Sequence, residues 1–395
     1  TLYLFMTNHF TCQKHLFSLP DDSHYLNCAT MSPNLKAVEE AGVQGVLQKS
    51  QPHRITQETF FETTAAVRPL FAQLVNCPDP ERIAFIPSAS YGMATVAKNL
   101  AYKPGLRAGQ EILLIHEEFP SDVYAWEEVC ADKGLKIRTV APPDGPENRG
   151  HRWNERLLEA ISPETCMVVV PHVHWADGTR YDLAAIRVRT REVGAWLVVD
   201  GTQSVGAMPL DVQAVQPDAL VCAGYKWLLG PYSTGLAYFG ETFDNGRPLE
   251  QNWINRAGSE EFSRLVHYRT EYRPKAARYS VGEQSNFILM PMLAAALRQL
   301  LDWQPERVQN YCRTLVGEPI QKLRNAGFWT EDEAWRGSHL FGVRPPAGTD
   351  IATVRQRLAE RRIQVSIRGD AIRVSPHVYN EAHQIDELVE TLLAV

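Results

Sequence analysis

Short apolar segments alternate with longer amphipathic segments through the middle of the chain, and this alternation strongly limits the possible folds. The apolar segments predict strands at residues 82–86, 111–115, 136–140, 166–171, 196–200, 218–223 and 234–239. Helices are predicted between them, at residues 90–101, 121–133, 154–161 and 183–193. Strands that alternate with helices favour a mostly parallel sheet with helices on both faces. In such a sheet, ligands bind beyond the carboxyl ends of the strands.

The pattern changes after residue 286. Helices are predicted at 290–303, 306–326 and 381–393, and strands at 339–343, 364–367 and 372–374. A chain of 395 residues exceeds one ordinary hydrophobic core, so two domains are expected. We predict a large α/β domain at residues 21–280. A small α+β domain at residues 281–395 follows, completed by an N-terminal arm of residues 1–20.

The composition is that of a soluble globular protein, with 44% hydrophobic and 22% charged residues. The net charge is −6 and there is no basic block, so neither nucleic acid nor a membrane surface is expected as a partner. Apolar runs fall far short of the roughly 20 residues that span a bilayer. The segment from Leu2 to Met6 lacks a basic flank, so no signal peptide is predicted. Seven cysteines without a Cys-x-x-Cys pair favour neither a disulfide framework nor zinc, and indicate the cytoplasm.

Two polar side chains follow neighbouring predicted strands. Lys226 comes just after the strand at 218–223, and Asp200 ends the strand at 196–200. An amine and a carboxylate at one edge of a sheet suit pyridoxal 5′-phosphate, which needs a Schiff-base partner and a partner for its ring nitrogen. On spacing alone, a solvated lysine and a helix-capping aspartate remain open alternatives.

The surrounding sequence resembles the class V aminotransferase family of fold type I enzymes that depend on pyridoxal phosphate. The similarity is carried by Val198-Val199-Asp200-Gly201-Thr202-Gln203-Ser204-Val205-Gly206 and by Gly224-Tyr225-Lys226-Trp227. It extends from Tyr25 to Asn380. The family includes cysteine desulfurases, selenocysteine lyases, kynureninases and isopenicillin N epimerase-like proteins. The resemblance implies a large domain with a mostly parallel sheet, a smaller α+β domain, and a homodimer with shared active sites.

The resemblance also implies roles for individual residues. Lys226 would form the Schiff base and move the α-proton, Asp200 would pair with the ring nitrogen, and Gln203 would contact the ring oxygen. Further cofactor contacts are expected from Ala89, Ser90, Phe119, Asp122, Trp175 and Tyr225, and from Trp253 and Asn286 of a neighbouring subunit. Independently, the Ser88-Ala89-Ser90 segment at a helix start favours phosphate.

Two arginines are candidates for binding the substrate. Arg373 matches the family's arginine for the substrate carboxylate, and Arg368 is near enough to assist. No metal is expected, because His172 and His174 lack further ligands at a suitable spacing.

The reaction is less constrained than the cofactor. The segment from Ile367 to Arg373 has no cysteine, and none follows Cys312, so a persulfide-forming desulfurase is not expected. Phe119 stands where the family's stacking histidine would be. The resemblance implies an external aldimine with an L-amino acid and removal of its Cα proton by Lys226. We favour a carbon–sulfur lyase or a transaminase. An epimerase or racemase, a kynureninase-like hydrolase and a non-catalytic binding module remain alternatives.

Overall fold

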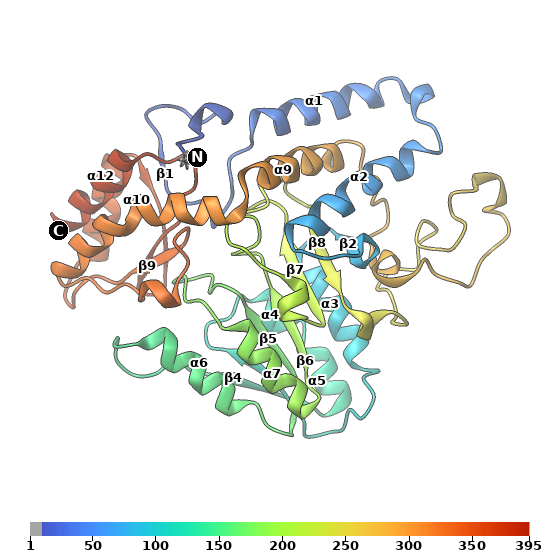
Figure 1. Cartoon of the computed structure of the whole chain (residues 1–395), viewed down its shortest axis with the longest axis horizontal. Coiled ribbons are helices and arrows are strands. Elements are labelled where there is room, and N and C mark those ends of the chain that lie inside the picture. Colours follow the sequence, from blue (N-terminus) through green and yellow to red (C-terminus); the bar gives the residue numbers. More distant parts are fainter. Residues whose placement is uncertain (1–9, 395) are drawn as a thin grey trace, which may run out of the picture.

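The computed structural model describes residues 10–394 (Figure 1). Residues 1–9 of the predicted arm, and with them the segment from Leu2 to Met6, lie outside the described residues. A seven-stranded sheet forms the centre of the molecule, in the order β2-β8-β7-β6-β5-β3-β4. The strands are β2 (Ile83–Ile86), β3 (Glu111–Ile115), β4 (Lys136–Val140), β5 (Thr165–Pro171), β6 (Trp196–Asp200), β7 (Ala219–Ala223) and β8 (Gly235–Phe239).

The sheet is mostly parallel, as predicted. Strands β4, β3, β5, β6 and β7 are paired in parallel, and only β8 runs antiparallel to both of its neighbours, β7 and β2. All seven predicted strands are present with small shifts at their ends. The predicted α/β fold with helices on both faces is therefore confirmed.

Burial on both faces explains why the central strands are continuous apolar runs. Side chains of successive strand residues point to opposite faces, and both faces are covered here. Leu197 and Val199 of β6 enter one hydrophobic core, while Trp196 and Val198 enter the other. Helices α3 (Ala89–Leu100), α6 (Arg149–Ala160) and α7 (Leu183–Val193) accompany these strands.

The predicted helix at 121–133 is two helices, α4 (Ser121–Tyr124) and α5 (Glu127–Lys133). The indole of Trp126 donates a hydrogen bond to the backbone carbonyl of Asp122, and the Trp126 backbone N–H bonds instead to Val123. The continuous i to i+4 pattern is interrupted at this point.

Two helices near the N-terminus were not predicted from the sequence. They are α1 (Lys36–Lys49) and α2 (Thr59–Leu74), and both pack against α9 (Leu289–Trp303). Helix α9 continues into α10 (Pro305–Asn325), so that α1, α9 and α10 lie across the upper part of Figure 1.

A smaller unit lies beside the large sheet (orange and red in Figure 1). Its three-stranded antiparallel sheet has the order β11-β12-β9, with β9 (Phe341–Val343), β11 (Ser366–Arg368) and β12 (Ala371–Val374). Helices α11 (Ile351–Glu360) and α12 (Ala382–Leu393) complete it. The N-terminal strand β1 (His24–Tyr25) pairs in parallel with β10 (Ile363–Gln364). The division into domains at residue 280 stays a prediction.

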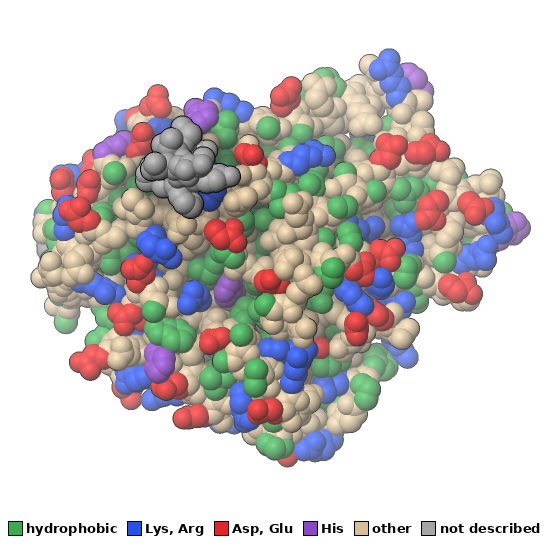
Figure 2. Space-filling view, in the orientation of Figure 1, with side chains coloured by type: hydrophobic (Ala, Val, Ile, Leu, Met, Phe, Trp, Pro, Cys, Tyr) green, Lys and Arg blue, Asp and Glu red, His purple; other side chains and the backbone are tan. Residues whose placement is uncertain are grey.

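Positive and negative side chains are interspersed over the face shown in Figure 2. Within residues 10–394, no helix combines the length and apolar character needed to cross a membrane. All seven cysteines are free thiols. No group of three or more potential metal ligands occurs in the described part of the chain. The cytoplasmic location stays a prediction.

Candidate active site

A cavity of about 300 Å³ lies at the carboxyl ends of the central strands. It is lined by Pro87, Ser88, Ala89, Ser90, Phe119, Ser121, Trp175, Asp200, Thr202, Gln203, Ala223, Tyr225, Lys226, Tyr232 and Ser233. Eight residues predicted from the sequence are among them: Ala89, Ser90, Phe119, Trp175, Asp200, Gln203, Tyr225 and Lys226. The fold brings them together because β6 and β7 are adjacent and parallel, so the segments after them leave the sheet at one edge.

Lys226 lies in the turn that follows β7. A side chain at Gly224 would place its Cβ 2.4 Å from Thr234 Oγ1, so this tight turn requires glycine. The Lys226 side chain is buried, and its Nζ lies 5.4 Å from the ring centre of Phe119. Burial lowers the pKa of Lys226 to about 8, although the charge of Asp200 opposes this shift. The amine therefore loses its proton far more readily than an ordinary lysine, as a nucleophile must.

Asp200 belongs to a group of three buried carboxyl groups. Its Oδ1 accepts a hydrogen bond from the Thr202 backbone N–H at 2.8 Å. Asp122 is fully buried, and neither of its carboxyl oxygens has a hydrogen-bond partner among the described residues. Burial, followed by the charges of Asp200 and Glu118, raises the pKa of Asp122 well above its usual range. Asp122 therefore takes up a proton more readily than an ordinary aspartate does.

Glu118 is the third carboxyl group, and the sequence did not single it out. Burial raises its pKa to about 8. Its Oε1 accepts a hydrogen bond from the Phe119 backbone N–H at 2.8 Å, while Oε2 has no partner within the described chain. In the sequence, only its position directly before Phe119 could have pointed to Glu118 as a site residue.

The N-terminus of α3 forms another side of the cavity. Ser88 caps the helix by accepting a hydrogen bond from the Tyr91 backbone N–H at 3.2 Å, and its hydroxyl lies 2.8 Å from that of Ser90. Hydroxyl groups and free N–H groups at a helix start favour a phosphate dianion. The predicted phosphate residues therefore lie where such a group can be bound.

The Gln203 side chain is held in a fixed orientation. Its Nε2 donates to the carbonyl of Ala29 at 3.1 Å, and its Oε1 accepts from the Trp227 indole at 2.8 Å. A second amide hydrogen on Nε2 remains for a bound group.

Arg373, on β12 of the smaller unit, is 2% exposed; it does not line the cavity itself but bonds to Trp175, which does. Its Nη1 donates to the Trp175 carbonyl at 2.8 Å and its Nη2 to Thr30 Oγ1 at 2.6 Å. Among residues 10–394, its guanidinium bonds only to neutral oxygens, and Nε has no partner. Burial, reinforced by the charge of Arg368, lowers the pKa of Arg373 to about 9. A buried cation without an anion suits a substrate carboxylate.

Arg368 lies on the neighbouring strand β11, with its guanidinium 5.7 Å from the centre of the Trp175 ring. The charges of both arginines lower the pKa of Lys226, because they lie near its amine. The two predicted substrate residues and the predicted Schiff-base lysine therefore share one region.

Trp253 and Asn286 do not line this cavity. Trp253 is 39% exposed and packs against Phe60 and Phe262. Asn286 accepts a hydrogen bond from the Leu289 backbone N–H at 2.8 Å, at the start of α9. Their predicted contact with a neighbouring subunit's cofactor stays a prediction.

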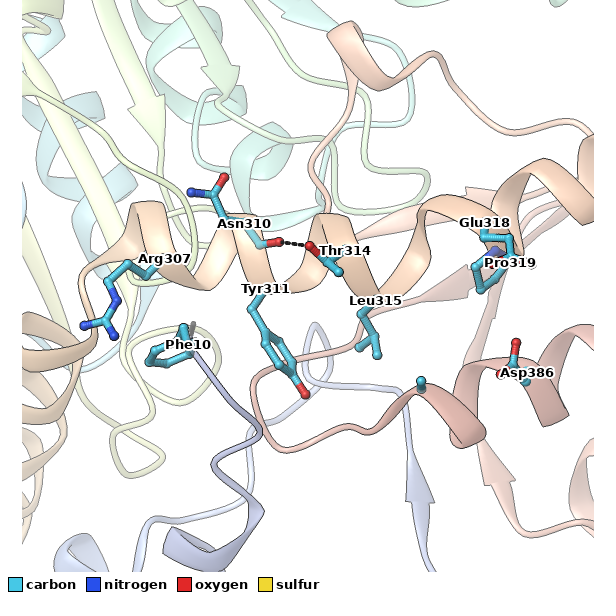
Figure 3. Close-up of a pocket in the computed structure, with 10 residues that line it drawn as sticks. Phe10, Arg307, Asn310, Tyr311, Thr314, Leu315, Glu318, Pro319 and Asp386 are labelled. Carbon is cyan, nitrogen blue, oxygen red and sulfur yellow. Dashed lines mark hydrogen bonds between the residues drawn. The ribbon is translucent and has the colours of Figure 1, made fainter. Parts of the chain in front are cut away.

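A second cavity, of about 530 Å³, lies beside α10 (Figure 3). Tyr311 and Leu315 line it, and Arg307 lies over the ring of Phe10 at 4.8 Å. Its described lining includes no buried ionisable group without a partner that is comparable with Arg373 or Asp122. The first cavity is therefore the candidate active site.

Comparison with known families decides the class of protein. The sequence model described as Aminotransferase class-V matches residues 24–388. The chain belongs to the class-V aminotransferase family. It is 29% identical to the isopenicillin N epimerase of Amycolatopsis lactamdurans over 337 residues, which cover 79% of this chain and 80% of that protein.

Two solved structures of related fold extend this comparison. A cysteine desulfurase from Escherichia coli has a TM-score of 0.78 and 21% identity, covering 96% of each chain. A cystine C–S lyase in complex with cysteine persulfide has a TM-score of 0.80 and 19% identity, covering 94% of this chain and 98% of that one. These matches support the class-V fold, fold type I.

Membership of the class-V family establishes that the chain is an enzyme, a transferase or a lyase, and that its cofactor is pyridoxal 5′-phosphate. The residues fit this group. Lys226 supplies a buried amine of lowered pKa, Asp200 a carboxylate, and the α3 N-terminus a site for phosphate.

Proposed function

We propose that this enzyme converts an L-amino acid, as a carbon–sulfur lyase or a transaminase, with Lys226 as its catalytic base. The observation that carries the proposal is the Arg373 guanidinium, which has no anionic partner among residues 10–394 and is buried near an amine of lowered pKa. A molecule with an α-carboxylate and an α-amino group matches these two side chains. When bound, pyridoxal phosphate supplies an electron sink for the bond that breaks at Cα.

The cofactor would be held by the residues that line the cavity. Lys226 would bond to its aldehyde, Asp200 would hold its ring nitrogen protonated, and the α3 N-terminus would bind its phosphate. Phe119 would cover one face of the ring. Asp122, whose raised pKa favours the protonated form, would then donate a hydrogen bond in the same group, since a protonated carboxyl is a donor.

Lys226 would also carry the proton that leaves Cα. Among residues 10–394, it is the only amine or imidazole that lines the cavity. A single base can remove the Cα proton for elimination, and can remove it and return it on the same face for transamination.

A nucleophilic cysteine is not available at the site. Cys28 is close enough for the charge of Lys226 to act on its thiol, but burial raises the pKa of Cys28 to about 12. A thiol of that pKa is almost entirely protonated near neutrality, so it is a poor nucleophile. This supports a lyase or transaminase over a persulfide-forming desulfurase.

Epimerisation is a second candidate, because of the 29% identity to an isopenicillin N epimerase. In that case a proton would return to Cα on the face opposite to the one from which Lys226 removed it. The similarity in fold to a cystine C–S lyase supports elimination instead.

Product analysis in deuterated water separates these reactions. The holoenzyme is incubated with a panel of L-amino acids that includes cysteine, cystine, alanine and glutamate. Pyruvate with released sulfide or persulfide supports a lyase, and a keto acid in stoichiometric yield supports a transaminase. Formation of a D-amino acid that carries deuterium at Cα would instead support an epimerase. No conversion of any amino acid, and no exchange at Cα, would contradict the proposal.

We also propose a homodimer in which Trp253 and Asn286 reach the neighbouring active site. Exposed apolar side chains on α1 (Val43, Val46 and Leu47) and around Trp253 support an interface on this side of the molecule. Light scattering should give twice the chain mass. A cofactor-loaded monomer would contradict this proposal.

A further inference from the structure

Asp177 lies outside the lining of the active-site cavity, in the segment that follows β5. Its carboxylate is buried and surrounded by cations. Oδ2 lies 3.0 Å from Arg149 Nη1 and 3.2 Å from Arg344 Nη2, and Oδ1 lies 3.2 Å from His174 Nδ1. Arg149 begins α6, beside the large sheet, whereas Arg344 follows β9 in the smaller unit. One carboxylate thus connects the large sheet, which carries the cavity, to the smaller unit, which carries Arg373.

The segment around Asp177 also lies directly against the strand next to Arg373. The Gly342 backbone N–H donates to the Asp177 carbonyl at 2.8 Å, and Gly342 is the cross-strand neighbour of Arg373. A Cβ at Gly342 would lie 2.9 Å from the Asp177 Cα. Gly178 has φ +80°, and a Cβ added there would lie only 2.2 Å from the Leu340 carbonyl oxygen. Two glycines therefore permit a backbone contact that fixes the segment on β9.

The same segment supplies the carbonyl that orients Arg373. That carbonyl belongs to Trp175, which lies two residues before Asp177 and donates its indole N–H to the Glu117 carbonyl at 2.7 Å. Arg344 pairs through Nε with Asp370, at 2.9 Å, in the turn that joins β11 to β12. Asp177 is thus connected both to the group that holds the guanidinium and to the hairpin that carries it.

We propose that Asp177 is a positioning residue for Arg373, and that it sets how tightly the enzyme grips a substrate α-carboxylate. Asp177 does not line the cavity, so it acts only through Trp175 and the hairpin. Without it, Arg373 would remain charged but would lose its orientation, and a bidentate grip depends on orientation. The inference rests on the proposed function, in which Arg373 binds that carboxylate.

Two small aminooxy compounds test this grip without knowledge of the substrate. Aminooxyacetate carries a carboxylate and O-methylhydroxylamine does not. Each would displace Lys226 from the cofactor: a C=N bond to the aminooxy nitrogen forms, the C=N bond to Lys226 breaks, and both amine protons pass to Lys226. The loss of the visible Schiff-base band in the holoenzyme gives an apparent dissociation constant for each compound. Their ratio measures the preference for a carboxylate.

We expect Asp177→Asn to reduce this preference about tenfold, with the constant for O-methylhydroxylamine changed by less than about twofold. Arg373→Gln should remove most of the preference. The double variant should lose little more than Arg373→Gln alone, because Asp177 acts through that residue. Asp182→Asn, an exposed helix cap in the same segment, is the matched control and should keep the wild-type ratio.

The inference would be overturned if Asp177→Asn weakened the binding of both compounds equally. It would also be overturned if the two substitutions reduced the carboxylate preference multiplicatively in the double variant. If Asp177→Asn does not fold, Arg344→Gln removes the same link from the other side, and the same ratio decides. Failure of either compound to react with the wild-type holoenzyme would instead count against the proposed role of Lys226.

Discussion

Two groups of buried ionisable side chains meet at the segment from Trp175 to Asp177. They differ in whether their members are paired with one another within the described chain. Around Asp177, the charges are paired: Arg149 lies 3.0 Å from Asp177 and 3.5 Å from Glu331, and Arg344 lies 3.2 Å from Asp177. Around Lys226, Arg373 bonds only to neutral oxygens within the described chain, and Asp122 has no hydrogen-bond partner there.

The difference separates structural charges from functional ones. Burial alone would raise the pKa of Asp177, but His174, Arg149 and Arg344 hold it well below its usual range. Burial and like charge instead raise the pKa of Asp122. An unpaired buried charge destabilises the folded protein, so it persists where a bound group compensates for it. The Asp177 group stabilises the fold, whereas the Lys226 group is completed by ligands.

Replacing Lys226 should have the largest effect. Lys226→Ala should lower activity by about 10⁴-fold and abolish the visible Schiff-base band, because no other amine of the described chain lines the cavity. Steady-state kinetics and absorbance measure both changes. The melting temperature of the cofactor-free protein should not fall. A fall would mean that the Lys226 group stabilises the fold and would end the contrast with Asp177.

Replacing Arg149 should act on stability instead. Arg149→Ala removes two ion pairs and the packing of the guanidinium on Trp153, so the free energy of unfolding should fall by about 3–5 kcal/mol. Urea unfolding of the cofactor-free protein measures it. Arg107→Ala is the control, because the exposed Arg107–Glu164 pair should contribute less than about 1 kcal/mol. Equal losses in both variants would contradict the contrast.

The pH dependence of the free energy of unfolding should show how far the buried Glu118 carboxylate destabilises the fold. Its folded pKa, about 8, lies above its ordinary value of 4.5, so its stabilising contribution is complete below pH 4.5 and is lost as pH rises through about 8. Glu118→Gln lacks this loss. The variant should therefore gain stability relative to the wild type between pH 4.5 and about 8. Parallel stability curves across this range would show that Glu118 is compensated within the protein.

Labelling of Cys28 should show the smallest effect. Its pKa of about 12 predicts almost no reaction with iodoacetamide in the folded protein at neutral pH, and Cys28→Ser should change activity by less than about twofold. Peptide mass spectrometry after brief labelling measures how much Cys28 has reacted, with the less buried Cys12 as an internal reference. Rapid labelling of Cys28 with loss of activity would place a reactive thiol at the site.

The seven strands of the large sheet were predictable because each is a short apolar run that is buried on the sheet. The placement of Asp200 and Lys226 at one edge followed from that. Helix α1 was not predicted, because its apolar residues lie all around the helix, with Val38 buried and Val43 and Val46 exposed. Its sequence therefore lacks a clear one-sided pattern.

The surroundings of the site were less predictable than its centre. Thr30 and Asp177 act on Arg373 through contacts between segments far apart in the sequence. No local pattern marks them, since a threonine near a strand and an aspartate in a turn are ordinary surface residues. Glu118 lies beside Phe119 in the sequence, but its burial is a property of the folded chain.

The pairing of β1 with β10, and of Asn27 with Ser375, has a consequence for the order of folding during synthesis. Strands β2 to β8 all lie between residues 83 and 239, so the large sheet can assemble while the chain is still emerging from the ribosome. The N-terminal strand must wait for its partner, which is made after all strands of the large sheet. A nascent chain can therefore hold Lys226 in place before Arg373 is made, and it can bind a substrate carboxylate only after β12 has joined the smaller unit.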